Sequence, residues 1–290
     1  MKRYITKCLI AACLVAASIA AVYVVKTVTL RNTSWSLEPG VHIVFAGASH
    51  VFHGIDDRMY AEIINVGDAN ERYMFTYLKL KYLLRDNPSV DTVVLQCAPT
   101  DLWEDTDAKY FQEPSIKSHL PYYWPLFGWE EWKAYADCPD ALTIIMQYLL
   151  SDFHKDGTSF FISHGKYYPE QQSLSAEEAA ALHCEQMTDS THTGHAINYR
   201  YLGKIKELCN ASGVKLFCIY CPVYHPEYFY DQEYYEEAYR SCCRDVPLLD
   251  FRDMPLPLDC YMDAHHVNAK GAVILTDSVM GRLRSKKPCH

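Results

Sequence analysis

Two short segments, far apart in the sequence, contain residues whose types and spacing could perform acyl-group chemistry. The first is 43–50, in which four apolar residues end at a Gly-Ala-Ser turn that contains Ser49. The second is 263–272, in which Asp263 precedes His266 by three residues. A histidine held by a carboxylate can take the proton of a serine hydroxyl, which then attacks an ester carbonyl. The two segments therefore predict a triad of Ser49, His266 and Asp263.

The residues on either side of these three indicate which elements must position them. The run Ile43–Ala46 is short and apolar enough for a buried strand, and Gly47 allows a sharp turn after it. In open α/β sheets, ligands bind beyond the carboxyl ends of the strands. We therefore expect Ser49 at that edge of a sheet. Asp263 and His266 are expected on a short loop ahead of the last helix.

The whole pattern resembles the SGNH (GDSL-like) hydrolase superfamily. It consists of Gly-x-Ser early in the chain, Asp-x-x-His-x-Asn-x-x-Gly late in the chain, and α/β sequence between them. The resemblance implies a three-layer α/β/α sandwich with a mostly parallel, flavodoxin-like sheet and a serine nucleophile. It also implies that the backbone N–H groups of Ser49 and of Gly67, the glycine after the second strand, bind the oxyanion.

The sequence departs from the family pattern at the third oxyanion donor. SGNH hydrolases commonly have Gly-x-Asn-Asp after the third strand, whereas this chain has Ala98-Pro99-Thr100-Asp101. Thr100 could donate through its hydroxyl, or Asn70 could reach the same place. Because a lost oxyanion donor can cost about 10²–10³ in rate, we expect a weaker oxyanion hole than that of a fast hydrolase.

Histidines near the two segments allow other interpretations of the site. His50, Asp263 and His265 could ligate zinc, but no pair has the helical i, i+4 ligand spacing, and the triad accounts for the positions better. We therefore predict no metal and no cofactor. His265 is the main rival of His266 as the base, but only His266 has the three-residue spacing from Asp263. The alternative function is a catalytically inactive binding or scaffold protein built on the same loops.

Alternating strand and helix patterns predict a mostly parallel sheet of about five strands. Helices are expected at 56–63, 71–85, 196–211, 231–243 and from 268 or 269 to 283. The expected strands are 42–47, 64–67, 91–97, 214–220 and 246–251, the last beginning near Pro247 and therefore suited to an edge.

Residues 102–195 interrupt this alternation and predict an insertion, with helices at 141–150 and 175–184. Aromatic residues crowd the stretch 110–135. One interpretation is an inserted subdomain with a small aromatic core. The other is a substrate platform or lid, in which Trp124, Trp129 and Trp132 would contact a sugar.

The N-terminus is expected to anchor the protein in a membrane. Lys2, Arg3 and Lys7 precede an uncharged apolar run, 8–25, which as a helix would span about 27 Å. Basic residues before the run favour a cytoplasmic N-terminus and an extracytoplasmic remainder, periplasmic or at the cell surface. A cleaved signal peptide, and a lipoprotein around Cys13, are the alternatives. The expected organisation is an anchor at 1–26, a polar link at 27–40 and an α/β domain at 41–290.

Charge and cysteine usage limit the partners and the covalent chemistry. The formal net charge is −9, and the first 26 residues contribute +4, so the remainder carries −13. Such an acidic domain argues against nucleic acid or anionic lipid headgroups as main partners. Export would permit disulfides among the twelve cysteines. However, Cys218 and Cys221 lie three apart in an expected strand and should face opposite sides. Buried free thiols are the favoured interpretation.

Membrane-tethered SGNH-like proteins that assist alginate O-acetylation or D-alanyl transfer look similar. They share the N-terminal anchor, the Gly-x-Ser start, the absence of a clean Gly-x-Asn-Asp motif and the Asp-x-x-His end. This resemblance implies O-acyl (acetyl) transfer or ester hydrolysis on a surface glycan. It also implies a polytopic membrane acyltransferase as a partner.

Overall fold

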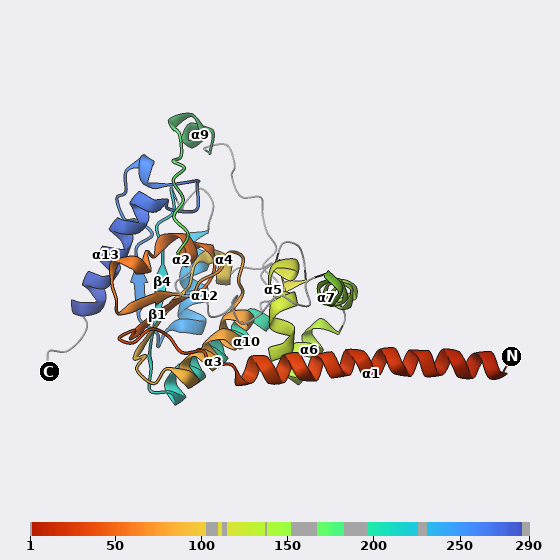
Figure 1. The fold of residues 1–290 in the computed structure, drawn as a ribbon. Coiled ribbons are helices and arrows are strands. Elements are labelled where there is room, and N and C mark those ends of the chain that lie inside the picture. The colour runs from red at the N-terminus through yellow and green to blue at the C-terminus, as the bar shows by residue number, and fades with distance from the viewer. Residues whose placement is uncertain are drawn as a thin grey trace.

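The fold is built on a central five-stranded parallel sheet, seen in a computed structural model of the chain (Figure 1). The strands are β1 (Ile43–Ala46), β2 (Ile63–Asn65), β3 (Thr92–Gln96), β4 (Lys215–Tyr220) and β5 (Leu248–Asp250). Their order is β2-β1-β3-β4-β5, and every neighbouring pair is parallel. The predicted α/β class and five-stranded sheet are confirmed. The structure describes residues 2–102, 110–111, 115–136, 138–151, 167–182, 196–225 and 231–285.

Short apolar sequences form these strands because both faces of the sheet are covered. Every residue of β1 and β3 is buried, as expected for central parallel strands. In the register, Val44 pairs with Ile64 on one side and Val93 on the other. β5 lies at the edge of the sheet directly after Pro247, a residue that cannot donate a hydrogen bond to a neighbouring strand.

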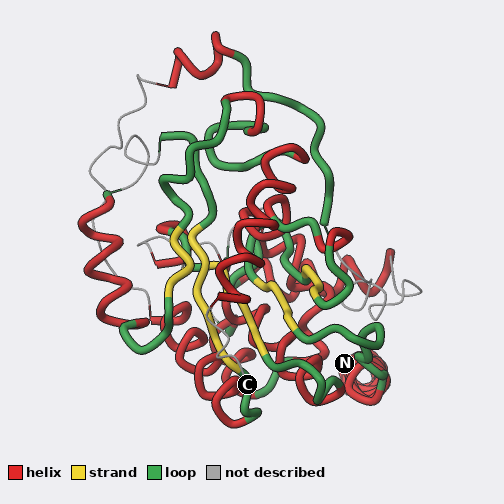
Figure 2. The backbone as a smooth tube through the Cα atoms, turned by 90° about the vertical axis from the view of Figure 1, so that its left-hand side faces the viewer, coloured by secondary structure: helices red, strands yellow, loops and turns green. Residues whose placement is uncertain are grey.

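Helices cover the two faces of the sheet and produce three layers (Figures 1 and 2). On one face, α3 (Tyr73–Asp86), α10 (Ala196–Ala211) and α12 (Gln232–Cys243) share a core with Val44 and Val93. On the other face, α2 (Ser49–Gly54) and α13 (Ala269–Ser285) share a core with Phe45 and Val94. The alternation along each strand explains why consecutive residues enter different cores.

The cysteines follow the same alternation. Cys218 packs in the first core and Cys221 in the second, as their spacing predicts. All ten cysteines in the described ranges are free thiols. The adjacent pair Cys242 and Cys243 is unbonded, with sulfur atoms 3.8 Å apart. Cys184 and Cys289 lie outside the described residues.

Near Ser49 the structure differs from the expected elements in two places. Ser49 begins a six-residue helix, α2, where a loop was expected. The helix expected at 56–63 is only a single 3₁₀ turn, η1 (Asp57–Met59), because β2 already begins at Ile63. The remaining short elements are α4 (Pro99–Leu102), α9 (Ala176–Ala181) and η6 (Leu258–Cys260).

Between residues 115 and 151, the described part of the insertion contributes four helical elements that pack beside α3 and α1. They are α5 (Ser115–Tyr123), η4 (Trp124–Leu126), α6 (Trp129–Tyr135) and α7 (Pro139–Ser151). Tyr123, Phe127 and Tyr135 are fully buried and belong to the same core as Phe75 of α3. Tyr123 and Phe75 have ring centroids 4.8 Å apart. These aromatic residues therefore extend the main core of the domain and do not form a separate one.

Helix α1 (Lys2–Asn32) is long and apolar enough to cross a membrane. The helix continues to Asn32, past residue 26, where the polar link was expected to begin. Trp35 is then buried against Tyr82 with 1% exposure. Its backbone N–H donates to Asp86 at 2.8 Å, and the Asn87 side chain bonds the backbone on both sides of Ser36. Burial of Trp35 outweighs the polar residues around it, so this segment is fixed to the end of α3.

Candidate active site

The carboxyl edge of the sheet brings together the three residues of the expected triad. Ser49 Oγ lies 2.8 Å from His266 Nε2. His266 Nδ1 lies 3.0 Å from each carboxylate oxygen of Asp263. Ser49 is the first residue of α2, after β1, and the other two residues precede α13. The three side chains form one continuous hydrogen-bonded chain.

The strand order explains why this edge is open to a ligand. From β1 the chain passes to β2 on one side, and it then returns to β3 on the other side. In a sheet of this order, the crevice for ligands lies at the carboxyl ends of the two strands where the direction reverses. Ser49 follows β1, and the loop with Thr100 follows β3, so both lie at this position.

Gly47 permits the close approach of the β1 turn to β3. Its φ angle is +137°, a conformation that residues with a side chain rarely adopt. A Cβ atom at this position would lie only 2.3 Å from Gln96 Cβ. The glycine of the Gly-x-Ser motif is therefore required by the backbone that presents Ser49.

Gln96 fixes the start of the helix that bears Ser49. The N-cap residue Ala48 has no side chain that can cap α2. Instead, the backbone N–H of Val51 donates to Gln96 Oε1 at 3.1 Å. Gln96 Nε2 donates to Asp101 at 3.0 Å, and Asp101 also accepts the N–H of Ala98. Gln96 is completely buried and joins α2 to the loop after β3.

The Asp263 carboxylate organises its own loop as well as the imidazole. One oxygen accepts the backbone N–H groups of His265 and His266 at 2.7 and 2.8 Å. Partial burial of Asp263 opposes ionisation, but the hydrogen bonds to His266 and to the backbone outweigh it, and the pKa of Asp263 falls to about 2. Asp263 is therefore ionised at neutral pH. A carboxylate at Nδ1 holds the proton there and leaves Nε2 to accept from Ser49.

Asn268 anchors the loop between the triad residues and α13. Its side chain accepts the N–H groups of Lys270 and Gly271, which caps the helix. Its amide nitrogen donates to the backbone of Gln172 and Asp259 at 3.0 and 2.8 Å. This residue, only 2% exposed, also attaches part of the insertion to the site.

The backbone N–H groups of Ser49 and Gly67, both expected as oxyanion donors, differ in whether they already donate within the protein. Within the described residues, the backbone N–H of Ser49 makes no recorded hydrogen bond and is available to a substrate. The N–H of Gly67, by contrast, donates to Asn65 Oδ1 at 2.9 Å. A Cβ atom at Gly67 would lie 3.1 Å from Phe52 N, so a larger residue would require α2 to shift by a few tenths of an ångström. In this structure the Gly67 amide is committed to Asn65 and not to an oxyanion hole.

The other candidate oxyanion donors, Thr100 and Asn70, lie on segments around the same edge of the sheet. Thr100 is half-buried in α4, two residues beyond the Ala98 amide that Asp101 holds. Asn70 is exposed and adopts a left-handed conformation with φ of +59°. Its loop is tied to the Gly47 turn by the Asp68 N–H, which donates to Gly47 O at 3.0 Å.

Three further histidines surround His266. Ring centroids of His50, His53 and His265 lie 5.1, 5.5 and 6.3 Å from that of His266. Burial, reinforced by the nearby His266, lowers the pKa of His50 well below its ordinary value and lowers that of His53. Both rings are thus favoured in the neutral form and pack beside the proposed base. His266, and not His265, is hydrogen-bonded to Ser49.

The roles of Gln96 and Asn65 in holding α2, and the place of His53 beside His266, were not predicted from the sequence. A signal existed for His53, because it lies three residues after His50 and would share one face of a helix with it. Asn65 donates to the carbonyl oxygens of Val51 and Ile55 at 2.8 Å each and so holds the end of α2. Such long-range partners leave no pattern in a single sequence.

The three tryptophans proposed to bind substrate lie elsewhere. Trp124 stacks on Tyr23 of α1, with ring centroids 5.5 Å apart, and Trp132 contacts the same tyrosine. Trp129 is 81% exposed. None of the contacts recorded for them in the described chain involves Ser49, Asp263 or His266. A different part of the insertion reaches the site, since Tyr168 stacks on Phe52 of α2 at 6.3 Å.

Two other clusters contain side chains that could hold a metal ion. The thiols of Cys97, Cys218 and Cys243 lie within 4.8 Å of one another in the core. The second cluster is Asp68, Glu71 and His119. Here, Glu71 already forms a fully buried ion pair with Lys79 at 2.6 Å. Neither cluster includes a residue of the triad.

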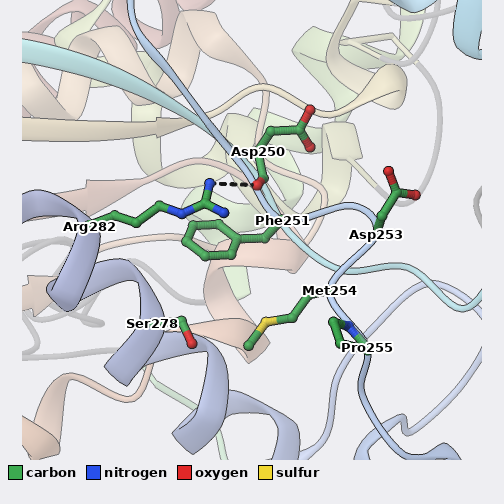
Figure 3. A pocket seen from close by; sticks show the side chains of 7 residues that line it. All are labelled: Asp250, Phe251, Asp253, Met254, Pro255, Ser278 and Arg282. Carbon is green, nitrogen blue, oxygen red and sulfur yellow. Dashed lines mark hydrogen bonds between the residues drawn. The ribbon is translucent and has the colours of Figure 1, made fainter.

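A cavity of about 600 Å³ lies beside edge strand β5 and the middle of α13 (Figure 3). Arg282 crosses it, donating to the Asp250 carbonyl at 2.9 Å and covering the Phe251 ring. Asp253 and Met254 line the same cavity. Because Ser49, Asp263 and His266 do not line it, it is not the cavity from which an ester would reach the triad.

No protein-family model and no curated protein sequence matches this chain. Among solved structures, it is similar to a GDSL-like lipase from Bacteroides thetaiotaomicron, with 10% identity and a TM-score of 0.40 over 91% of this chain and 98% of that one. An acylhydrolase from Bacteroides fragilis gives 11% identity and a TM-score of 0.38, covering 91% and 94%. An acetyl xylan esterase gives 13% identity and a TM-score of 0.39, covering 84% and 100%.

Proposed function

We propose that this chain is an SGNH-type serine esterase or O-acyltransferase that acts on acyl esters. The observation that carries the proposal is the continuous hydrogen-bonded chain from Ser49 through His266 to Asp263. It lies at the edge of the sheet where ligands of such folds bind. The N–H of Ser49 is available beside it.

In the proposed reaction, Ser49 Oγ attacks the ester carbonyl carbon while His266 Nε2 takes the hydroxyl proton. The carbonyl oxygen becomes an oxyanion, which the Ser49 N–H and a donor from the Thr100 or Asn70 loop would stabilise. His266 then returns the proton to the departing alkoxide, leaving an acyl group on Ser49. Water or a sugar hydroxyl attacks this acyl group while His266 takes its proton; the bond from the acyl carbon to Ser49 Oγ then breaks, and His266 returns the proton to Ser49. Asp263 stabilises the imidazolium in both steps.

We further propose that the substrate is an acylated glycan of the cell envelope and that α1 anchors the enzyme with its N-terminus in the cytoplasm. The length and apolarity of α1 support the anchor. The three basic residues before the apolar run support the orientation. A polytopic membrane acyltransferase that delivers the acyl group would be the natural partner for transfer.

Active-site labelling tests the nucleophile directly. A fluorophosphonate probe should label the full-length protein, and Ser49→Ala should abolish the labelling because the probe bonds only to an activated serine. His266→Ala should reduce labelling strongly while the thermal unfolding midpoint changes little. A folded wild-type protein that fails to label would favour the non-catalytic scaffold and contradict the proposal.

A second experiment separates transfer from hydrolysis. Thr100, in place of the asparagine of the family pattern, suggests slow hydrolysis of small activated esters and faster transfer to a glycan. The purified protein would be given an acyl donor with and without an oligosaccharide, and the products would be followed by mass spectrometry. Rapid hydrolysis that no acceptor changes would reject transfer and leave an esterase.

A further inference from the structure

An open apolar groove runs between α1 and the inserted helices. Its volume is about 580 Å³. It is lined by Ala16 and Tyr23 of α1, by Leu142 and Met146 of α7, and by Trp124 and Trp132, which both contact Tyr23. All ten lining side chains are apolar or aromatic. A groove of this composition is unfavourable in water and favourable in contact with hydrocarbon.

The groove lies at the depth of a lipid chain if α1 crosses a bilayer. Residues 8–25 of α1 are uncharged, and Lys26 marks the end of the apolar run. At about 1.5 Å per helical residue, Ala16 lies about 15 Å below Lys26, which is half of a hydrocarbon core. The α1 residues of the groove, Ala16 to Tyr23, therefore lie about 5–15 Å below Lys26, within the leaflet that faces the α/β domain.

Helix α7 has the position of a helix that lies in the membrane surface, and its sequence is mostly apolar. Figure 1 shows α7 almost end-on while α1 runs lengthwise, so the two axes cross steeply. Leu142 is 66% exposed, and Met146 and Leu149 are half-buried along the same groove. A helix that crosses the direction of a membrane-spanning helix lies parallel to the bilayer plane. Its exposed apolar side then faces acyl chains.

Two buried donors beside the groove lack partners in the described part of the chain. They are Trp124 Nε1, on a side chain only 3% exposed, and Thr27 Oγ1, on a residue 8% exposed. Trp124 lines the groove, and Thr27 lies one helical turn beyond Tyr23 on the same face of α1. Buried donors normally have an acceptor. Trp124 therefore brings an unpartnered donor to the wall of the groove.

Basic and aromatic groups occur where the headgroups would lie. Lys26 Nζ stands 5.8 Å from the centroid of the Tyr148 ring, and Arg31 donates to the Phe127 carbonyl at 3.3 Å. Trp129 is exposed beside them at the start of α6. Tryptophan, tyrosine and lysine or arginine are the residues that gather at membrane interfaces.

We propose that an acyl chain of a membrane glycerolipid occupies this groove and that α7 is embedded in the leaflet facing the α/β domain. The inference rests on the transmembrane placement of α1 in the proposed function. It does not depend on the triad. The groove would fix the inserted helices to the membrane surface, in addition to the single anchor.

Lipid photocrosslinking tests the proposal with the full-length protein. The chain would be reconstituted in phosphatidylcholine and phosphatidylglycerol vesicles that contain a phospholipid with a diazirine in its acyl chain. After illumination, mass spectrometry would locate the adducts. We expect adducts in 9–15 of α1, which only lipid surrounds, and also at Leu142, Ile145 or Met146 of α7. Val273 and Ile274, exposed apolar residues of α13, provide a matched control and should carry none.

The positions of the adducts separate the possible failures. Adducts in α1 without adducts in α7 would overturn the groove proposal and leave the anchor intact. Adducts in neither helix would overturn the transmembrane placement and the inference with it. A photoreactive amino acid placed at Leu142 in native membranes provides the second arm: if it joins α7 to a second copy of the chain or to a helix of another membrane protein, a protein and not a lipid occupies the groove. A Met146→Glu variant should lower α7 labelling about tenfold, because a charged side chain disfavours contact with hydrocarbon. Labelling of 9–15 should persist and shows that the variant remains inserted.

Discussion

The carboxyl edge of the sheet and the groove along α1 are held together by different forces. At the edge, directional hydrogen bonds of 2.7–3.0 Å fix Ser49, His266 and Asp263. In the groove, the recorded hydrogen bonds of Tyr23 and Trp132 are 3.5 Å long, and ring stacking dominates. The hydrogen bonds at the edge fix atomic positions, whereas ring stacking in the groove tolerates changes of shape. Chemistry on a carbonyl carbon needs fixed atomic positions. Contact with fluid acyl chains does not.

The largest effect is expected from removing the base at the edge of the sheet. His266→Ala should lower kcat for p-nitrophenyl acetate by about 10⁴- to 10⁶-fold, because His266 Nε2 is the atom that accepts from the Ser49 hydroxyl. Steady-state hydrolysis measures this loss. His265→Ala is the matched control and should cost about tenfold or less, since its ring is not bonded to Ser49. A larger loss of kcat in His265→Ala than in His266→Ala would mean that His265, and not His266, is the base.

A methyl group in the turn before Ser49 tests how rigid this edge is. Gly47→Ala should reduce the free energy of unfolding by about 3–5 kcal/mol, from backbone strain and from the collision with Gln96 together. Urea denaturation provides the measurement. Gly213→Ala, at a φ of +68° with open space around it, should cost only about 1–2 kcal/mol. Equal losses at the two glycines would show that the contact between β1 and β3 relaxes easily.

Acid should weaken the edge of the sheet through its buried imidazoles. The folded state resists protonation of His50 and His53, whereas the unfolded chain takes up these protons near the ordinary value of 6.5. The unfolded state therefore binds more protons, and the free energy of unfolding should fall as pH drops from about 7 to about 5. Asp263, with a pKa of about 2, stays ionised over this range and adds no slope. Urea titrations of wild type and His50→Gln would compare the slopes, and an unchanged slope would contradict this assignment.

The smallest effect is expected where the groove opens. Leu142→Ala should change the free energy of unfolding in detergent by less than about 0.5 kcal/mol, because the side chain is 66% exposed. The same substitution at fully buried Leu95 of β3 should cost about 2–5 kcal/mol. Thermal unfolding of both variants gives the comparison. A large loss at Leu142 would mean that the groove closes on itself in solution.

The sequence was informative about the edge of the sheet because its chemistry uses particular residue types at short spacing. Asp263 and His266 share one loop, and Ser49 follows an apolar strand, so their approach could be predicted. Their catalytic role remains a proposal. The mostly parallel sheet of about five strands also follows from alternating strands and helices.

The remaining features depend on partners that are distant in the chain. Gln96 caps α2 from a position 45 residues away, so α2 carried no local capping signal. Helix α5 contains Pro121, a residue that usually interrupts helices. Trp124 and Trp132 were recognisable as an aromatic cluster, but only the fold shows that they face α1 and not the triad.

The fixed connection between α1 and the end of α3 also limits how far Ser49 can move relative to α1. A flexible segment over residues 27–40 would let the domain wander by about 20 Å from its anchor. Here Arg85 donates to the Arg31 carbonyl at 2.9 Å, and Asn87 and Asp86 hold Trp35 and Leu37, so the segment cannot act as a tether. Where α1 crosses the bilayer, Ser49 is then carried at a constant height above it. On the proposed placement of α1, esters within that thin layer would meet Ser49 at high effective concentration, and esters farther from the bilayer would be out of its reach.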